Sequence, residues 1–149
     1  MTPQQIKSSI CALFEVQQDG ETFVISTPLN MSGLDKVHIY ASPRGDGKWR
    51  LDDNGEVAFS AAMAGVNTKS EQFQAAIEAS MFGGPSLVEW DADEETLALN
   101  VSADEIGLGC LALAHMASRL YLSVMLPKKT REKKRLSGAD SLHYYGNRK

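Results

Sequence analysis

The sequence predicts an α+β domain in which helices cover one side of an antiparallel sheet. Several short runs between residues 22 and 101 alternate apolar and polar side chains with period two, as strands with two different faces do. Three longer segments carry apolar side chains at three- and four-residue steps, as amphipathic helices do. The predicted order is a helix, three or four strands, a helix, two strands and a long helix.

The N-terminal segment 3–18 is predicted to be a helix. Thr2 and Gln5 have the spacing of a capping box, and Pro3 suits a first helical position. Ile6, Ile10 and Leu13 fall on one face, which we expect to pack on an apolar surface, with Cys11 buried at its border. Strands are predicted over 22–27, closed by a proline, and over 36–42.

A third strand is predicted over 48–52, and the segment after it is ambiguous. The Asn54-Gly55 pair is typical of a two-residue hairpin turn, in which both central residues need a positive φ. In the following run, 56–64, the alanines favour a helix, whereas the alternation from Val57 to Met63 and the preceding turn favour a strand. We predict a strand and keep the helix as the alternative.

The stretch 68–101 organises the rest of the chain. Thr68 and Glu71 have capping-box spacing, so a helix is predicted from residue 69 to the Gly-Gly-Pro break at 83–85. Two alternating runs then flank the acidic turn 91–94, which predicts a hairpin with one apolar face and a solvated tip. A third capping box, Ser102 and Glu105, opens the longest helix, which is expected to reach residue 126. Its apolar seam consists of Ile106, Cys110, Leu113, Ala117, Leu120 and Val124.

Charge divides the chain into two parts. Residues 1–126 contain seven basic and seventeen acidic groups (net −10), whereas residues 127–149 contain eight basic and two acidic groups (net +6). We therefore predict one folded domain over 1–127 and a basic, flexible tail over 128–149. The N-terminus lacks the basic start and apolar block of a signal peptide, and no run of eighteen apolar residues is present, which predicts a cytoplasmic protein without stable membrane insertion.

The sequence contains no motif with a defined catalytic mechanism. P-loop, dinucleotide-binding, zinc-protease and nucleophile-elbow patterns are all missing, and the three histidines and two cysteines show no metal-ligand spacing. We therefore expect no enzyme activity, cofactor or metal. Two alternatives remain open: a small enzyme with an unrecognised active site, and nucleic-acid binding by the tail, although the acidic body and the lack of interleaved aromatics argue against the latter.

The chain resembles the class I type III secretion chaperones, the Tir chaperone family, in three features. These are the order of its elements, the motif Met81-Phe82-Gly83-Gly84-Pro85 and the tail motif His143-Tyr144-Tyr145-Gly146. The resemblance covers most of residues 1–126 as a pattern of elements. It implies a small acidic homodimer in the bacterial cytoplasm that binds the N-terminal segment of one or more effector proteins before export. It also suggests the secretion ATPase or export apparatus as a partner for the tail.

Two surfaces follow from this resemblance and from the strand patterns. Because strands such as 22–27 and 36–42 carry apolar side chains on both faces, some of these side chains must lie at an interface. The predicted effector contacts lie on the first helix and early strands: Phe14, Val16, Phe23, Ile25, Ile39 and Leu51. The predicted dimer interface consists of Phe59, Phe73, Ala76, Ile77, Ser80 and Met81.

Overall fold

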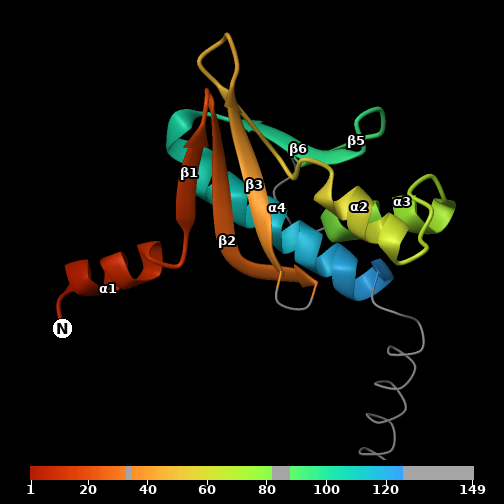
Figure 1. Cartoon of the computed structure of the whole chain (residues 1–149), viewed down its shortest axis with the longest axis horizontal. Coiled ribbons are helices and arrows are strands. Elements are labelled where there is room, and N and C mark those ends of the chain that lie inside the picture. Colours follow the sequence, from red (N-terminus) through yellow and green to blue (C-terminus); the bar gives the residue numbers. More distant parts are fainter. Residues whose placement is uncertain (33–34, 82–87, 126–149) are drawn as a thin grey trace, which may run out of the picture.

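The protein is an α+β domain built on a six-stranded antiparallel sheet, which confirms the predicted fold class. The computed structural model describes residues 1–32, 35–81 and 88–125. The strands lie in the order β1-β2-β3-β4-β6-β5, so only the last two exchange places relative to the sequence (Figure 1). Their bounds are β1 Glu15–Asp19, β2 Thr22–Ser32, β3 Asp35–Pro43, β4 Trp49–Asp52, β5 Glu89–Asp91 and β6 Thr96–Val101. The basic tail lies outside the described residues.

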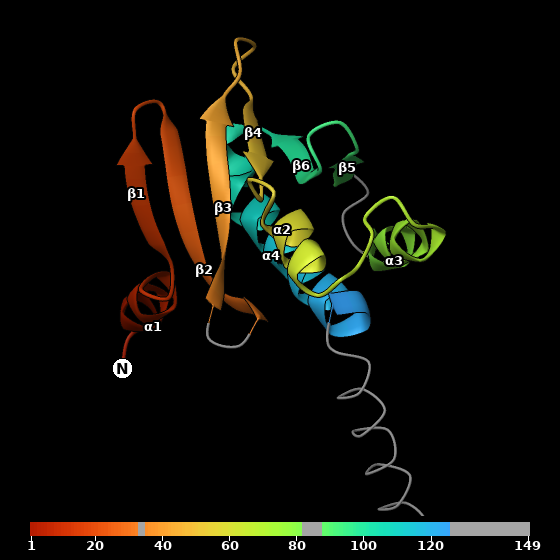
Figure 2. The same cartoon turned by 45° about the vertical axis from the view of Figure 1, so that its right-hand side comes forward.

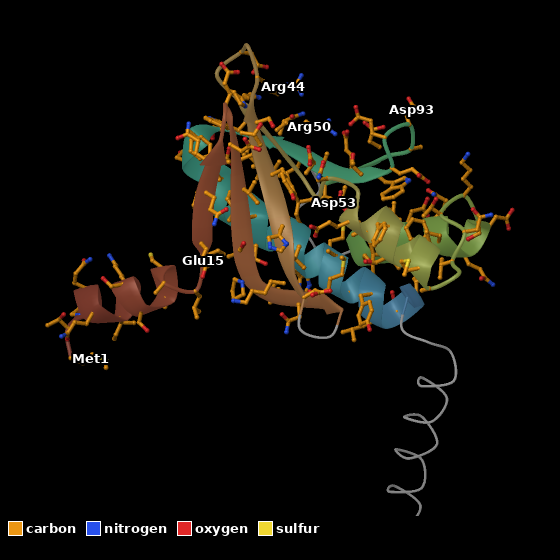
Figure 3. All side chains as sticks on the ribbon, in the orientation of Figure 1. Met1, Glu15, Arg44, Arg50, Asp53 and Asp93 are labelled. Carbon is orange, nitrogen blue, oxygen red and sulfur yellow. The ribbon has the colours of Figure 1, made fainter. Side chains whose placement is uncertain are left out.

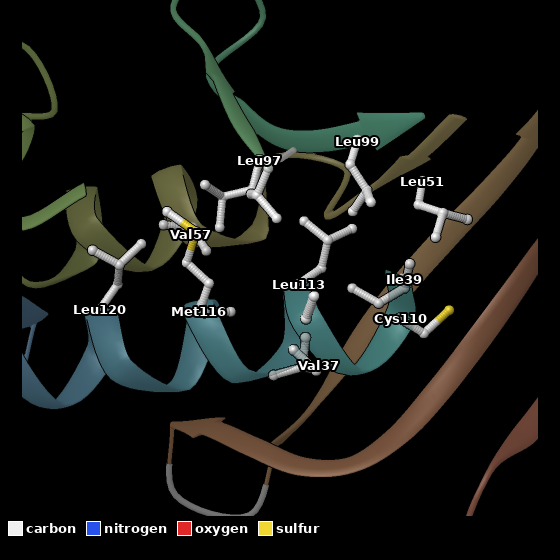
Figure 4. Packing of buried hydrophobic residues seen from close by; sticks show 14 of the residues in the cluster. Val37, Ile39, Leu51, Val57, Leu97, Leu99, Cys110, Leu113, Met116 and Leu120 are labelled. Atoms are coloured by element: carbon white, nitrogen blue, oxygen red, sulfur yellow. The ribbon is translucent and has the colours of Figure 1, made fainter. Parts of the chain in front are cut away.

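One long helix covers one face of the sheet and forms the core with it. It starts with a 3₁₀ turn, η1 (Ala103–Glu105), continues as α4 (Ile106–Leu120) and ends in a π-helical turn, η2 (Tyr121–Met125). The predicted capping box of Ser102 and Glu105 is present. Cys110, Leu113 and Leu120 of the predicted seam are at most 2% exposed and meet Ile39, Leu51, Leu97 and Leu99 of the strands (Figure 4).

The close approach of α4 to the sheet depends on a small residue. A Cβ added at Gly109 would lie 2.5 Å from Cδ1 of Leu51 and 3.2 Å from Cγ1 of Val101. The segment Ala103–Val124 is long and apolar enough to cross a membrane by length and composition alone. In this fold, however, its apolar seam packs on the sheet, as the core helix of a globular domain does.

The first helix is shorter than predicted, and its end becomes a strand. α1 spans Pro3–Cys11 and has the predicted capping box at Thr2, but residues 15–19 form β1 and pair antiparallel with Thr22–Ser26. The reason is the tight turn after Asp19, where Gly20 adopts a φ of +64° and brings the two strands into register. The prediction of a helix to residue 18 is therefore wrong, and so is that of a buried Cys11, which is exposed.

The ambiguous run 56–64 is a helix, α2 (Glu56–Met63), so the strand prediction is wrong. Asn54 and Gly55 do have the expected positive φ values, 52° and 78°. The chain nevertheless enters a helix because the carboxylate of Asp53 accepts hydrogen bonds from the N–H groups of Gly55 (3.2 Å) and Val57 (3.0 Å) at the helix start. Alanine-rich composition then favours the helix.

Two other boundaries differ from the prediction. α3 spans Glu71–Met81 and is capped by Ser70, whose hydroxyl accepts from the N–H of Phe73, whereas the Thr68 hydroxyl donates to Glu95 of the β5–β6 turn. Strand β2 does not stop at Pro28 but continues to residue 32 with a break in register between Ser26 and Asn30, because proline has no N–H to donate. The Gly-Gly-Pro break lies outside the described residues.

Candidate partner-binding surfaces

The two N-terminal elements project from the rest of the domain. We call α1, β1 and their connection, residues 2–19, the arm, and the remainder of the described chain the body. In both views, α1 lies beyond the lower end of β1 and away from α2, α3 and α4 (Figures 1 and 2). No residue of α1 is buried. The arm is thus held to the body mainly by the pairing of β1 with β2.

The arm exposes most of its apolar side chains. Ile6 is 47%, Ile10 55%, Leu13 53% and Val16 61% exposed. The predicted packing of the α1 face on an apolar surface is therefore not found in the described chain. Phe14 is the exception among the apolar residues of the arm, because it is half-buried and packs against the core.

Strand β1 is an open edge of the sheet. It is the end strand, its five residues are all exposed, and β2 is its single partner in the described chain. Alternate N–H and C=O groups of an end strand point away from the sheet and are free to pair with another chain. The other end strand, β5, has three residues. The arm therefore presents the longer open edge.

The predicted effector contacts divide into two groups. Ile25, Ile39 and Leu51 are 7%, 0% and 0% exposed, so these predicted contacts lie in the core of the described chain and not on its surface. They occupy the strand positions that face α4, as their pairing through Ile25↔Ile39 and Ala41↔Leu51 requires. Phe23 points to the same side and is half-buried beside Trp49, with ring centroids 5.8 Å apart.

Phe14 and Val16 remain as accessible predicted contacts. They lie in and next to β1, and Val16 pairs with Ile25, so it points to the α4 side of the sheet beyond the part that α4 covers. The apolar side chains of α1 were not among the predicted contacts. Their periodicity was visible in the sequence, but only the structure shows that nothing in the described body covers them.

The predicted dimer interface is largely used inside the chain. Phe73, Ile77 and Ser80 are 0%, 3% and 6% exposed, so this predicted face packs inside the described chain and is not presented on its surface. Phe73 packs edge-on against Trp90, with centroids 5.3 Å apart. Ala76 is half-buried, and the side chain of Met81 lies outside the described part. On α2, Phe59 is 68% exposed and is the accessible member of the set.

The sheet face opposite α4 is polar. The register places His38, Tyr40, Arg50 and Asp52 on it, together with Val24, whose apolar surface is half-buried. Of the apolar side chains predicted to lie at an interface because the strands have them on both faces, this face carries Val24 and Tyr40 among polar neighbours. Apolar surface is exposed on helices and on the edge strand instead.

Arg50 is the centre of an ion-pair network on this polar face. Its guanidinium lies 3.3 Å from Asp52, 3.3 Å from Glu94 and 3.9 Å from Asp91, and also donates to the Thr96 hydroxyl. The groups are partly exposed, so the network contributes little to stability and mainly orients β4 and the β5–β6 hairpin. The acidic hairpin tip was predicted to be merely solvated, and this pairing was missed. Within the described residues, no group of three metal-ligating side chains occurs.

A second polar pair links β3 to α2. Nδ1 of His38 lies 3.5 Å from Oε1 of Glu56, with both side chains partly exposed. Burial raises the pKa of the Glu56 carboxyl, and the neighbouring His38 opposes that rise. A histidine and a carboxylate can exchange a proton, but neither residue lines the cavity between α3 and the C-terminal end of α4.

Asp53 is a buried carboxylate with a structural role. It is 1% exposed and accepts from the N–H groups of Gly55, Val57 and Leu97, the last at 3.0 Å, so it joins β4, α2 and β6 (Figure 3). Burial raises the pKa of its carboxyl, and the three backbone donors oppose the rise. The sequence pattern did not indicate this role, because Asp53 lies three residues before the first residue of α2 and Gly55 occupies the usual capping position.

The fold and these surfaces define the class of the protein: an α+β domain with a covered core and a partly uncovered N-terminal arm. Residues 27–119 match the model of a family described as the domain of unknown function DUF1828. Because this match covers more than half of the 149 residues, the chain belongs to that family. Neither the curated proteins nor the solved structures contain a match to the chain.

Proposed function

We propose that the protein is a cytoplasmic chaperone of bacterial type III secretion. In this proposal it is a homodimer that holds the N-terminal segment of one or more effector proteins soluble and partly unfolded before export. It uses no cofactor and no catalytic step. The observation that carries the proposal is the arm, in which an open strand edge and an uncovered apolar helix face occur together.

The arm suits an extended partner. A segment that adds to β1 would satisfy the free N–H and C=O groups of that strand. The apolar side chains of the segment would contact Val16, Leu13 and the α1 face of Ile6 and Ile10. The partner must lose conformational freedom when it binds, which keeps the affinity moderate for the area covered. Such reversible binding suits a chaperone that later releases its cargo.

Photo-crosslinking tests the effector site. A photoreactive amino acid replaces Val16 in one variant and Lys48, exposed next to the β3–β4 turn, in the control. In the native host, the Val16 position should crosslink to the N-terminal segment of an exported protein, and the Lys48 position should not. Deleting the gene should lower the cellular level of that exported protein.

Three results would contradict the proposed site. If the Val16 position crosslinks to no exported protein, the proposal that the arm binds an effector is wrong. If both positions give identical crosslinks, the binding is not specific to the arm. Crosslinks from Val16 to a second copy of the chain would show that the open edge serves self-association instead.

For the homodimer, the outer face of α2 is the best-placed surface. Phe59 and Met63 are 68% and 76% exposed there, although α2 also contributes the buried Val57 to the core. Phe59→Ser should convert a dimer to a monomer by light scattering with little change in folded secondary structure. Leu122→Ser, which alters an apolar side chain 59% exposed on η2, is the matched control and should stay dimeric. Equal masses for Phe59→Ser and the wild type would reject this interface.

A further inference from the structure

A cavity lies between α3, the loop that follows α2, and the C-terminal end of α4. Its volume is about 620 Å³, which is within the range of small-molecule sites. The α2–α3 loop contributes Gly65, Val66, Asn67 and Ser70, α3 contributes Gln72, Ala76, Ala79 and Ser80, and the α4–η2 end contributes Arg119, Ser123 and Val124. It shares Ala76 and Ser80 with the predicted dimer interface and no residue with the arm.

The charge of the cavity is opposite to that of the body. Arg119 is the only lysine or arginine between residues 70 and 125, and it lies in the cavity lining. No aspartate or glutamate is among the lining residues. Within the described chain, the Arg119 guanidinium has no ion-pair partner. A cation is thus presented without a counter-charge in an otherwise acidic domain.

Ser80 supplies an independent observation. It is 6% exposed and lines the cavity, yet its hydroxyl makes no hydrogen bond with the residues that the structure describes. A buried hydroxyl without a partner costs about 1–3 kcal/mol, so such groups are normally satisfied by protein, water or ligand. A ligand oxygen in the cavity would accept this donor.

Helix chemistry explains part of this arrangement but not all of it. Arg119 is in the last turn of α4, where a cation stabilises the helix dipole. That role does not require a cavity next to it, and it does not provide a partner for Ser80. The two groups share one feature, which is that both can donate to an anionic oxygen in the same space.

We propose that this cavity binds a small oxyanion, a molecule with a carboxylate or phosphate group, which Arg119 and the Ser80 hydroxyl hold by hydrogen bonds. Guanidinium groups form two parallel hydrogen bonds with such groups, which gives both strength and orientation. The other lining side chains are small apolar ones (Val66, Ala76, Ala79 and Val124) and polar ones (Asn67, Ser70, Gln72 and Ser123), so the rest of the ligand is small and has both apolar and polar surface. This site is separate from the arm and does not depend on the chaperone proposal.

An NMR titration of the full chain tests the site. Inorganic phosphate and succinate are added separately at constant ionic strength, with sodium chloride as the reference salt. One of the two should shift the amide signals of residues 65–80 and 119–124 in a saturable way, and the tighter of the two identifies phosphate or carboxylate as the preferred group. Arg119→Gln should weaken binding at least tenfold.

Two variants make the test specific. Arg44→Gln removes an exposed positive charge beside the β3–β4 turn, away from the cavity, and should bind as the wild type does (Figure 3). Ser80→Ala should weaken binding and, without ligand, raise the melting temperature slightly, because it removes an unsatisfied hydroxyl. Non-saturating shifts with both anions, wild-type binding by Arg119→Gln, or a lower melting temperature for Ser80→Ala would each overturn the proposal.

Discussion

The arm and the body each contain an amphipathic helix with a similar sequence pattern, but the apolar face is exposed in the arm and buried in the body. In the arm, Ile6 and Ile10 of α1 and Leu13 just after it remain about half exposed. In α4, Cys110, Leu113 and Leu120 follow the same kind of spacing and are at most 2% exposed. The difference is the surface beneath each helix: α4 crosses the sheet, whereas α1 lies beyond the end of the edge strand β1 (Figures 1 and 2).

This contrast teaches that a helical stripe predicts a face and not its partner. The family match begins at residue 27, within β2, and ends at residue 119, within α4, so it includes most of the body and none of the arm. The body is thus the part whose fold is explained by its own contacts. The arm is the part whose apolar surface requires an explanation from outside the described chain.

The largest expected effect comes from removing a core side chain of the body. Leu113 is fully buried between α4 and the sheet, so Leu113→Ala should lower the free energy of unfolding by about 2–5 kcal/mol through lost burial and the remaining cavity. Chemical denaturation followed by circular dichroism measures this. The matched change in the arm, Ile10→Ala, should cost at most about 0.5 kcal/mol, because that side chain is already half exposed.

The variants Leu113→Ala and Ile10→Ala also test whether the arm and the body differ in packing. A loss for Ile10→Ala as large as that for Leu113→Ala would mean that α1 packs on the protein in solution. In that case the arm would not be available to a partner.

An intermediate effect is expected for the polar groups that start helices in the two regions. Asp53→Asn keeps the shape but places an amide N–H₂ against a backbone donor such as that of Val57, which should cost about 1–3 kcal/mol. Thr2→Ala removes the cap of α1, where the Thr2 hydroxyl accepts from the Gln5 N–H, and should reduce local helicity without changing the global transition. If both variants unfold at the same temperature as the wild type, Asp53 does not stabilise the fold as assigned.

The pH dependence of Asp53 has a defined sign. Because burial raises the pKa of its carboxyl in the folded state, the folded protein binds this proton more readily than the unfolded chain. The Asp53 contribution to the unfolding free energy therefore decreases as the pH rises from the ordinary value of 3.8 through the raised value. The stability difference between wild type and Asp53→Asn should grow on acidification through that window, and a difference that shrinks there would contradict the assignment.

The smallest perturbation is a chemical label on the two cysteines. Cys11 of the arm is exposed, whereas Cys110 of the body is buried, and burial raises the pKa of its thiol to about 11. A thiol reagent at pH 8 should therefore modify one cysteine per chain in the native protein and two in guanidinium chloride, because only the thiolate reacts. Peptide mapping should place the native label on Cys11. Rapid native labelling of Cys110 would show that α4 separates easily from the sheet.

Sequence reasoning recovered the body better than the arm. The capping box and seam of α4 and the β5–β6 hairpin were predicted because local patterns agreed with the buried faces found in the structure. The arm was predicted as one long helix because Val16 fits either a helix border or an alternating strand. The turn at Gly20 and the pairing with β2 decided between them.

The predicted sites show the same limit. Ile25, Ile39 and Leu51 were recognised as apolar, but alternation cannot say which face of a strand a helix will cover, and α4 covers theirs. The Arg50 network and the Arg119 cavity join residues more than forty positions apart, and no local pattern encodes such proximity.

The sequence by itself determined the acidic character of residues 1–126, the α+β class, the capping boxes of α1 and of the segment that opens α4, and the apolar seam of α4. These follow from composition and from contacts between residues a few positions apart. Only the tertiary structure decided that 56–64 is a helix started by Asp53, that α3 is buried against its own chain, and that the arm is open. Each of these depends on which distant surface supplies a hydrogen bond or excludes water, and that is settled when the whole chain folds.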